Sequence, residues 1–526
     1  MRKSAAGTKA MVVSPHYLAS AAGARMLQKG GNAFDAAVAV SACLAVVYPH
    51  MTGLGGDSFW LTFEAGEGRV RAYNGSGRSG AEATRERFAG MDAIPHRGVL
   101  SAITVPGMAD GWWAVHEAYG RLSFADTLVP AIEYAENGFP CSINQSRHSA
   151  ACREVLSASP SAASIYLPGG RAPAPGSRFV QGELARSLRL LAEGGREVFY
   201  GGALAKEMVR DLRLRGGLLT EEDLAGHRGK WEEPLAGSYR GYTLHQAPPN
   251  SQGFVGIMTM QMLEHFDFDH IEHGSYEYYH LLVEALKLAF RDRNELLTDP
   301  EFHPLPLDRL LSQAYARELA GRIDLRRARP LDGPLMGSDT AYAAVVDEEG
   351  NAVSFIQSLY FEFGSGVVAG DTGILLQNRG SFFSLDANRV NRLEPNKRTF
   401  HTLMPAMACR DGKPAILYGT QGGEGQPQTQ TALLTRMIDY GMTPRQAIEE
   451  PRWVWGRTWG EETRELKTES RIAEAVRERL SLAGHEVRVV KPFDEITGHA
   501  QAILIDERNC RQGAADPRCD GEAIGW

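Results

Sequence analysis

The segment Asp339–Phe355, "DTAYAAVVDEEGNAVSF", decides the fold. Ala341 to Val346 and Ala352 to Phe355 each have the composition of a strand, and the polar, glycine-containing residues between them predict a hairpin turn. The preceding stretch, residues 326–339, reads "RRARPLDGPLMGSD" and has no apolar period. A polar tether therefore runs directly into Thr340, at the start of a predicted core strand.

The position of Thr340 suggests a catalytic role. A Thr hydroxyl is a poor nucleophile unless a base lies beside it. A cut between Asp339 and Thr340 would supply that base, because the new α-amino group titrates near roughly 7.7–8.0 and is partly neutral at physiological pH. The tether is then interpreted as a cleavage site, with Thr340 attacking the Asp339 carbonyl. The alternative is that Thr340 is an ordinary strand residue, since β-branched side chains are common in strands.

A second candidate element is the stretch Tyr418–Leu434, "YGTQGGEGQPQTQTALL". A predicted strand, residues 414–418, runs toward Gly422 and Gly423, and a helix is expected from about residue 429 to 440. Glycines allow backbone N–H groups to point outward, and a helix start adds positive potential. This combination predicts an oxyanion hole. The alternative is a tight glycine turn before a helix.

Other segments predict helices. Ser14-Pro15 has the composition of a helix start, which predicts a helix through Leu27, and further helices are expected over residues 33–47 and 276–297. "GLGGD", residues 53–57, follows a helix and precedes a strand. This order is the reverse of a dinucleotide-binding turn, so the sequence does not predict a dinucleotide site.

Composition narrows the possible functions. The chain has 526 residues, a formal charge of −8 and 43% hydrophobic residues. The acidic balance argues against a nucleic-acid partner, and no apolar stretch is long enough to cross a membrane. No secretory signal is visible, so a cytoplasmic location is expected. The six cysteines form no CxxC pair and the histidines show no ligand spacing, so no metal and no cofactor is predicted.

Taken together, these stretches resemble the γ-glutamyltransferase family (γ-glutamyl transpeptidase, glutathione hydrolase) of N-terminal-nucleophile hydrolases. The resemblance spans almost the whole chain and includes "HYLASAAGARMLQKGGNAFDAAVAV", "MTGLGGDSFWL", "EALKLAFRDR", "DTAYAAVVDEEGNAVSF", "FGSGVVAGDTGILLQN", "GTQGGEGQPQTQTALL" and "IDYGMTPRQAIEEPR". It implies an α/β (α+β) fold, the αββα four-layer sandwich. It also implies a proenzyme that cuts itself into a large subunit, residues 1–339, and a small subunit, residues 340–526. The two would remain together as a heterodimer acting on a small molecule, with further dimerisation left open.

The resemblance assigns roles to the candidate catalytic residues. Thr340 matches the nucleophile, and Ser358 matches a position where the family often has a Thr that hydrogen-bonds the nucleophile. Gly422 and Gly423 match the oxyanion-hole pair. On this interpretation the loose tether makes the bond between Asp339 and Thr340 accessible.

The predicted substrate-binding positions depart from the family pattern. The family binds the substrate α-carboxylate with an Arg and a pair of hydroxyls. Here the Arg position falls near Gly75, with Arg78 as a possible substitute, and the hydroxyl pair aligns with His401 and Thr402. The family holds the α-ammonium with a Gln and an acidic residue, and the matching positions in this sequence are Arg379 and Phe382.

This exchange changes the expected substrate. Arg379 would repel an ammonium group and Phe382 cannot replace a carboxylate, whereas an Arg suits a carboxylate as a bidentate donor. The alternative is that Arg379 turns into a surface ion pair. The neighbouring aromatic residues favour a small pocket; they are Tyr360, Phe361, Phe382 and Phe383.

The sequence therefore predicts a threonine amidohydrolase for the amide of a small carboxylate, with an oxamate-type amide favoured. The alternatives within the family are a true glutathione hydrolase or γ-glutamyl transpeptidase and a glutaryl-cephalosporin acylase. Outside the class, the alternative is an uncleaved, non-catalytic binding protein.

Overall fold

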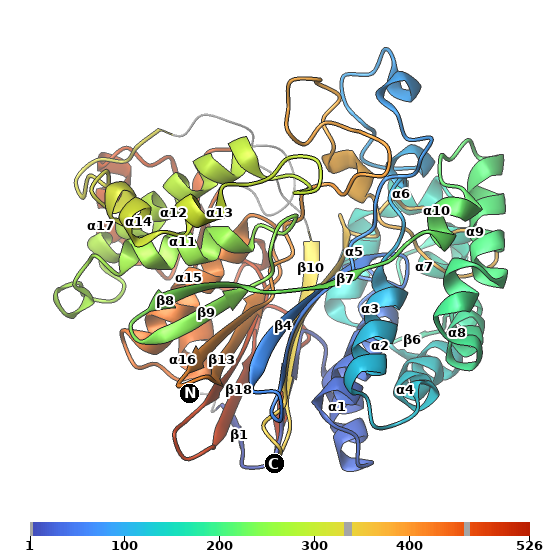
Figure 1. Cartoon of the computed structure of the whole chain (residues 1–526), viewed down its shortest axis with the longest axis horizontal. Coiled ribbons are helices and arrows are strands. Elements are labelled where there is room, and N and C mark those ends of the chain that lie inside the picture. The colour runs from blue at the N-terminus through green and yellow to red at the C-terminus, as the bar shows by residue number, and fades with distance from the viewer. Residues whose placement is uncertain (1–3, 331–338, 457–462) are drawn as a thin grey trace.

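Two antiparallel sheets of seven strands each form the centre of the molecule in a computed structural model that describes residues 4–330, 339–456 and 463–526 (Figure 1). The first sheet has the order β1 (Ala5–Gly7), β18 (Arg511–Ala515), β17 (Ala500–Ile505), β13 (Lys413–Thr420), β12 (Ala406–Arg410), β9 (Tyr242–Gln246) and β8 (Leu235–Tyr239). The second has the order β19 (Glu522–Gly525), β2 (Met11–Ser14), β10 (Asp339–Val346), β11 (Ala352–Tyr360), β3 (Asp57–Glu64), β4 (Arg69–Asn74) and β7 (Lys230–Glu232).

The hairpin predicted from the opening segment is confirmed as β10 and β11, and its alternation explains the layers. Tyr342 and Ala344 belong to a core shared with residues of the first sheet, among them Met407. Ala341 and Ala343 belong instead to a core shared with helices. Because successive side chains of a strand point to opposite faces, β10 is buried on both sides. This accounts for its nearly continuous apolar sequence.

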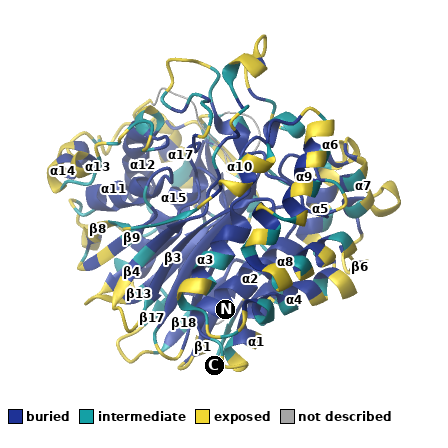
Figure 2. Ribbon diagram, turned by 45° about the vertical axis from the view of Figure 1, so that its right-hand side comes forward, coloured by how far each residue is buried: buried dark blue, intermediate teal, exposed yellow. Residues whose placement is uncertain are grey.

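Helices cover the outer faces of both sheets (Figures 1 and 2). The second sheet is covered by α1 (Tyr17–Gln28), α2 (Ala33–Val47), α3 (Met108–Tyr119), α4 (Phe124–Asn137) and α8 (Gly182–Tyr200). The first sheet is covered by α11 (Gly253–Leu263), α12 (Tyr276–Leu296), α15 (Gly425–Ile438) and α16 (Pro444–Glu449). The expected αββα four-layer sandwich is thus confirmed. Every residue of α2 is buried, which explains why its sequence is apolar all round.

The remaining elements lie outside these four layers. The helices are α5 (Ile143–Ala151), α6 (Arg153–Ser157), α7 (Pro160–Tyr166), α9 (Ala203–Leu214), α10 (Glu221–Ala225), α13 (Leu307–Leu310), α14 (Gln313–Ala320) and α17 (Glu474–Leu482). The strands form a pair, β5 (Phe139–Pro140) and β6 (Arg178–Phe179), and a trio, β14 (Trp453–Trp455), β15 (Leu466–Glu469) and β16 (Val487–Val490). Within the described residues, no helix is both long and apolar enough to cross a lipid bilayer.

Two helix starts differ from the sequence predictions. The first helix begins at Tyr17 with His16 as its N-cap, so the prediction of Ser14 as the cap was wrong. Ser14 is instead paired with Glu522 of β19, which keeps its backbone in the sheet. Helix α15 begins at Gly425, a few residues before the expected start, because the glycine turn leads into it directly.

Candidate active site

Thr340 lies where the pairing of β10 and β11 is irregular. Asp339 is opposite Tyr360 and Ala341 is opposite Gln357, so two residues of β11 face the single residue Thr340. This arrangement is a β-bulge, which re-aims the side chains at one end of a strand. One of the two facing residues is Ser358, the predicted second hydroxyl. The irregularity therefore places both hydroxyl residues together.

The Thr340 side chain is fully buried, and its Oγ1 has no hydrogen-bond partner among the described residues. Asp339 and Thr340 are consecutive residues of β10, so the structure describes the chain before the predicted cut. In this state the expected hydrogen bond from Ser358 to the Thr340 hydroxyl is absent. Most of the tether, residues 331–338, lies outside the described residues.

Arg379 lies beside Ser358 in the interior. Its Nη2 donates to Ser358 Oγ at 3.3 Å, and the same oxygen accepts from the Tyr360 N–H at 2.7 Å. The guanidinium carbon lies 4.5 Å from the ring centre of Tyr360 and 5.2 Å from that of Phe382. Arg379 is 0% exposed, so the alternative of a surface ion pair is wrong.

Two nitrogens of the Arg379 guanidinium, Nε and Nη1, have no hydrogen-bond partner among the described residues. Burial lowers the pKa of Arg379 to about 10, while the nearby Asp57 carboxylate opposes this shift. The group is therefore cationic at neutral pH. Buried charges are expensive unless they are paired and hydrogen-bonded. Two free donors on a buried cation indicate a place for an anionic ligand.

Asp57 and His401 form a buried pair next to this group. Asp57 is the register partner of Ser358 across β3 and β11. His401 Nε2 lies 3.1 Å from Asp57 Oδ2. The sequence singled out His401 but missed Asp57, which follows the two glycines of the turn before β3. The signal available in the sequence was a carboxylate between the glycine turn and the strand-like run that follows it.

The glycines before Asp57 allow the turn to pack against β11. A Cβ atom at Gly56 would lie 2.2 Å from the Ser358 carbonyl oxygen, and one at Gly55 would lie 2.3 Å from the Leu375 carbonyl oxygen. Any side chain at either position would force the backbones apart. The "GLGG" sequence is therefore explained by close approach of main chains beside the site.

Gly422 and Gly423 form the turn between β13 and α15. Their φ angles are 125° and 49°, which are conformations that glycine adopts readily. Neither N–H donates to a partner among the described residues. Free N–H groups at a helix start suit a developing negative charge. The oxyanion hole at Gly422 and Gly423 thus stays a prediction, with which these φ angles and N–H groups are compatible.

A buried hydrogen-bond network supports this turn, and no local sequence pattern predicts it. Gln252 Nε2 donates to the Thr402 carbonyl at 2.9 Å and to the Gly423 carbonyl at 3.2 Å. Arg293 of α12 donates to Gln252 Oε1 at 3.0 Å and forms a fully buried ion pair with Glu424 at 2.6 Å. The network joins the His401–Thr402 segment to the glycine turn.

Arg78, one of the predicted substrate-binding residues, makes its contacts elsewhere. Its guanidinium forms ion pairs with Asp299 at 3.4 Å and Glu301 at 2.7 Å, and its side chain is 31% exposed. It also donates to the Asn396 carbonyl. The guanidinium is thus already paired, and a role in substrate binding has no support from its contacts.

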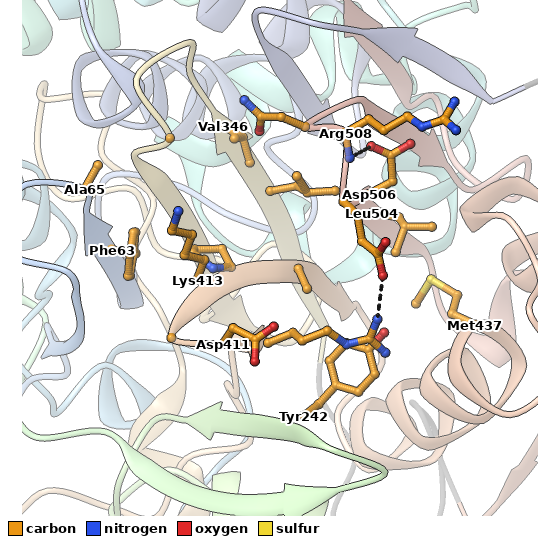
Figure 3. Close-up of a pocket in the computed structure, with 18 of the residues that line it drawn as sticks. Phe63, Ala65, Tyr242, Val346, Asp411, Lys413, Met437, Leu504, Asp506 and Arg508 are labelled. Atoms are coloured by element: carbon orange, nitrogen blue, oxygen red, sulfur yellow. Dashed lines mark hydrogen bonds and ion pairs between the residues drawn. The ribbon is translucent and has the colours of Figure 1, made fainter.

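A large surface groove lies away from these residues (Figure 3). It has a volume of about 1420 Å³ and is lined by side chains that include Tyr242, Asp411, Lys413 and Arg508. Val346, the last residue of β10, also lines it. Thr340 lies near the other end of the strand, about 20 Å away at roughly 3.3 Å per residue. The groove is therefore not the site of Thr340 chemistry.

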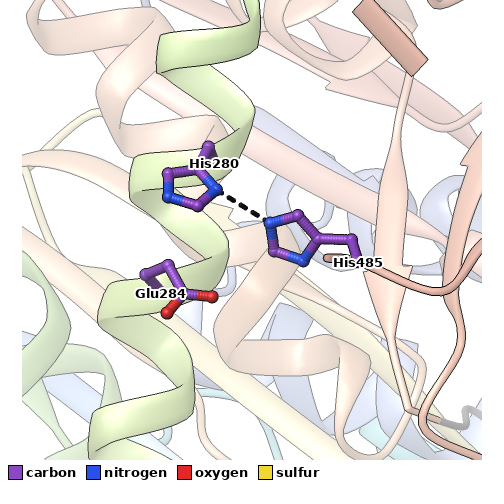
Figure 4. A group of neighbouring side chains, drawn as sticks. All are labelled: His280, Glu284 and His485. Carbon is purple, nitrogen blue, oxygen red and sulfur yellow. Dashed lines mark hydrogen bonds between the residues drawn. The ribbon is translucent and has the colours of Figure 1, made fainter. Parts of the chain in front are cut away.

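The fold also brings together two dispersed histidines and an acid, His280, Glu284 and His485 (Figure 4). Their potential ligand atoms lie within 4.8 Å of one another. His280 Nδ1 lies 2.8 Å from His485 Nε2, and Glu284 accepts hydrogen bonds from Lys287 Nζ and the Arg329 N–H, each at 2.9 Å. The carboxylate is thus already paired with a cation. The hydrogen bonds of the cluster connect α12 to the segments that contain Arg329 and His485.

Comparisons with known proteins agree with this geometry. The gamma-glutamyltranspeptidase family model matches residues 19–526. The chain is 63% identical over 525 residues to the glutathione hydrolase-like YwrD proenzyme of Bacillus subtilis, with 100% of both chains covered. It is 42% identical over 531 residues to the oxamate amidohydrolase proenzyme of Klebsiella pneumoniae, again with 100% of both covered.

A solved structure extends the comparison to the fold. The cephalosporin acylase from Bacillus halodurans superposes with a TM-score of 0.93 at 35% identity, covering 100% of this chain and 97% of that one. Together these similarities confirm the family, the fold and the type of reaction expected from the sequence. The chain therefore belongs to the gamma-glutamyltranspeptidase family of N-terminal-nucleophile hydrolases, enzymes that act on amide bonds.

Proposed function

We propose that this chain is a threonine amidohydrolase that cuts itself between Asp339 and Thr340 and hydrolyses the amide of a small carboxylate. The large part, residues 1–339, and the small part, residues 340–526, remain together as a heterodimer, because the central sheet contains strands of both. Among the described residues, no helix has the length and apolar character needed to cross a membrane.

Thr340 carries the chemistry after the cut. Its α-amino group takes the hydroxyl proton while Oγ1 attacks the substrate carbonyl carbon, forming a tetrahedral intermediate. The Gly422 and Gly423 N–H groups stabilise the resulting oxyanion, a contribution of several kcal/mol in related sites. The protonated α-amino group of Thr340 gives the proton to the leaving nitrogen. The carbon–nitrogen bond of the substrate then breaks, and the acyl group stays on Oγ1 as an ester. Water then attacks this ester, the α-amino group again serving as base, and the carboxylic acid is released.

The observation that carries the choice of substrate is the Arg379 guanidinium. It is buried beside Ser358 and has two nitrogens free of partners among the described residues. A substrate carboxylate would pair with Nη1 and the second N–H of Nη2, which form one fork of the guanidinium, a bidentate geometry that Arg favours. An α-ammonium would meet a like charge, with Phe382 in place of an acidic partner. The site therefore suits a carboxylate substrate without an amino group.

The aromatic residues support a small substrate. The rings of Tyr360 and Phe382 stack with centres 4.1 Å apart, and both are buried. This pair occupies space beside the guanidinium that a long acyl chain would need. Oxamate, in which the carboxylate adjoins the amide, is the favoured substrate type. The similarity to the oxamate amidohydrolase proenzyme of Klebsiella pneumoniae supports the same choice.

A glutaryl-type amide is the second candidate, and the structural match to a cephalosporin acylase favours it. A substrate profile separates the possibilities. Processed enzyme is incubated with oxamate, glutaryl-p-nitroanilide and γ-glutamyl-p-nitroanilide, with Thr340→Ala as the blank. The proposal expects kcat/KM to be highest for oxamate. Highest activity on the γ-glutamyl compound would refute the argument from Arg379.

A further inference from the structure

The Asp57–His401 pair has a fixed proton arrangement. Asp57 Oδ1 accepts hydrogen bonds from the Gly77 N–H at 3.2 Å, the Gly107 N–H at 3.0 Å and Gln377 Nε2 at 3.1 Å. Three donors on one oxygen stabilise the ionised carboxylate. The second oxygen, Oδ2, faces His401 Nε2 at 3.1 Å. Because a carboxylate can only accept, His401 Nε2 carries the proton and donates it.

The tautomer leaves His401 Nδ1 as a hydrogen-bond acceptor. This nitrogen is buried and has no hydrogen-bond partner among the described residues. Burial together with the Arg379 charge keeps the pKa of His401 well below its usual value, so the ring is neutral. A neutral imidazole with a free lone pair is therefore held inside the site.

The free groups of the site define what a ligand must offer. Arg379 presents two unpaired donor nitrogens, Nε and Nη1, and His401 presents one unpaired acceptor, Nδ1. Leaving such groups unpaired in the interior is costly. A complementary ligand has an anionic oxygen pair for the guanidinium and an N–H or O–H donor for the imidazole. The monoamide of a short dicarboxylic acid has both, since its scissile amide carries N–H groups.

We propose that His401 is a specificity-determining residue that accepts a hydrogen bond from the N–H of the scissile amide, and that Asp57 is the positioning residue that fixes its tautomer. The inference rests on the proposed function, since it names what the same site recognises. Asp57 is the register partner of Ser358, which lies opposite Thr340. Asp57 and Thr340 therefore lie at the same position along the sheet, and the His401 imidazole that pairs with Asp57 is assigned to the same region.

The variant Asp57→Asn tests the tautomer directly. The Asn carbonyl oxygen takes the place of Oδ1, because three donors point at that position. The amide nitrogen then faces His401 Nε2 and donates to it, which moves the imidazole proton to Nδ1. In this variant the protonated His401 Nδ1 would face the substrate amide N–H as a second donor, whereas in the wild type Nδ1 is an acceptor.

The experiment compares oxamate with the monomethyl ester of oxalate, which has the same carboxylate and acyl carbon but no N–H. The amide-to-ester ratio of kcat/KM is expected to fall at least tenfold in processed Asp57→Asn, as the loss of one buried hydrogen bond predicts. Any effect on carboxylate binding by Arg379 cancels in the ratio. An unchanged ratio would overturn the inference.

A second variant covers the case in which Asp57→Asn does not fold or process. His401→Phe keeps a planar ring but removes the lone pair, so the same drop in ratio is expected. A ratio like that of wild type in this variant would also overturn the inference. If wild type hydrolyses neither compound, the proposed function fails instead, and the two failures are distinguished by the wild-type measurement alone.

Discussion

Ser358 and Asp57 are register partners on neighbouring strands, and both act on the Arg379 guanidinium. The hydroxyl of Ser358 accepts a hydrogen bond from Nη2, and the Asp57 carboxylate provides the nearby negative charge. The buried cation is thus balanced only in part, with two donors left free. Unpaired buried donors lower the stability of the fold, and in the proposed function they are the groups that bind the substrate carboxylate.

Replacement of the nucleophile should separate processing from folding. Thr340→Ala lacks the hydroxyl that attacks the Asp339 carbonyl, so the chain is expected to remain one polypeptide with no hydrolase activity. Thr340→Ser keeps a hydroxyl and is expected to be cut. A denaturing gel and mass spectrometry of the purified proteins check this. Two fragments from Thr340→Ala, with a new terminus at residue 340, would contradict the assignment.

Two buried arginines offer a matched test of stability against function. Arg379 is unpaired at two nitrogens, whereas Arg293 forms a buried ion pair with Glu424. Arg379→Met is expected to lower kcat/KM for carboxylate substrates by about 100-fold or more, with a smaller loss of stability than Arg293→Met, because the removed charge is incompletely paired and Asp57 keeps its three N–H donors. Arg293→Met is expected to cost about 3–5 kcal/mol, because it leaves Glu424 without its buried cation.

Urea unfolding in the Thr340→Ala background measures both effects on a single uncut chain. Each variant is compared with Thr340→Ala itself, at a pH where all carboxylates are ionised in the unfolded chain. A large destabilisation by Arg379→Met, equal to that of Arg293→Met, would show that the Arg379 guanidinium is fully paired in solution.

Asp57 should make stability and specificity depend on pH in opposite directions. Burial raises the pKa of Asp57 from 3.8 to about 6, so the folded chain holds this proton more tightly than the unfolded chain does. The folded chain therefore binds more protons between these values, and its stability falls as pH rises from about 4 to above 6. The total contribution is about 3 kcal/mol. It is present below the unfolded pKa and lost above the folded one.

Specificity needs the ionised form of Asp57, since only the carboxylate fixes the His401 tautomer. The amide-to-ester ratio of kcat/KM should therefore rise as pH increases through about 6. Asp57→Asn should show neither this rise nor the corresponding loss of stability. The difference between wild type and variant, measured from pH 4.5 to 7.5, isolates Asp57 from other titrating groups. A parallel pH dependence in both proteins would refute the assignment.

The sequence predicted those parts of the fold that local patterns determine. The β10–β11 hairpin followed from a polar turn between two apolar strands, and the boundaries of α2 followed from its apolar run and the Pro after it. The candidate site was located through single residues with unusual neighbours, such as Thr340 after a polar tether and Gly422 before a helix. These features depend on the nearest few residues, so they are visible without a structure.

Relationships across the sandwich could not be predicted in the same way. Asp57 and His401 are separated by 344 residues, and Arg293 and Glu424 by 131. Their contacts depend on how two sheets and their helices pack, and no local period records this. Arg78 was predicted to bind the substrate carboxylate from its position in the sequence, but its guanidinium is paired with Asp299 and Glu301. Pairing depends on neighbours that are distant in sequence.

The last prediction concerns the two residues that set the proposed substrate class. The double variant Arg379→Gln, Phe382→Asp places an amide and a carboxylate where the resemblance to the family expects the α-ammonium to bind. It removes the buried cation, so the ratio of kcat/KM for γ-glutamyl-p-nitroanilide to that for oxamate should rise at least tenfold. Arg379→Gln alone is the control: it removes the repulsion without supplying a carboxylate, so a smaller rise is expected. Processing of each variant is checked on a denaturing gel before the kinetics. A ratio unchanged in the processed double variant would mean that other residues select the substrate.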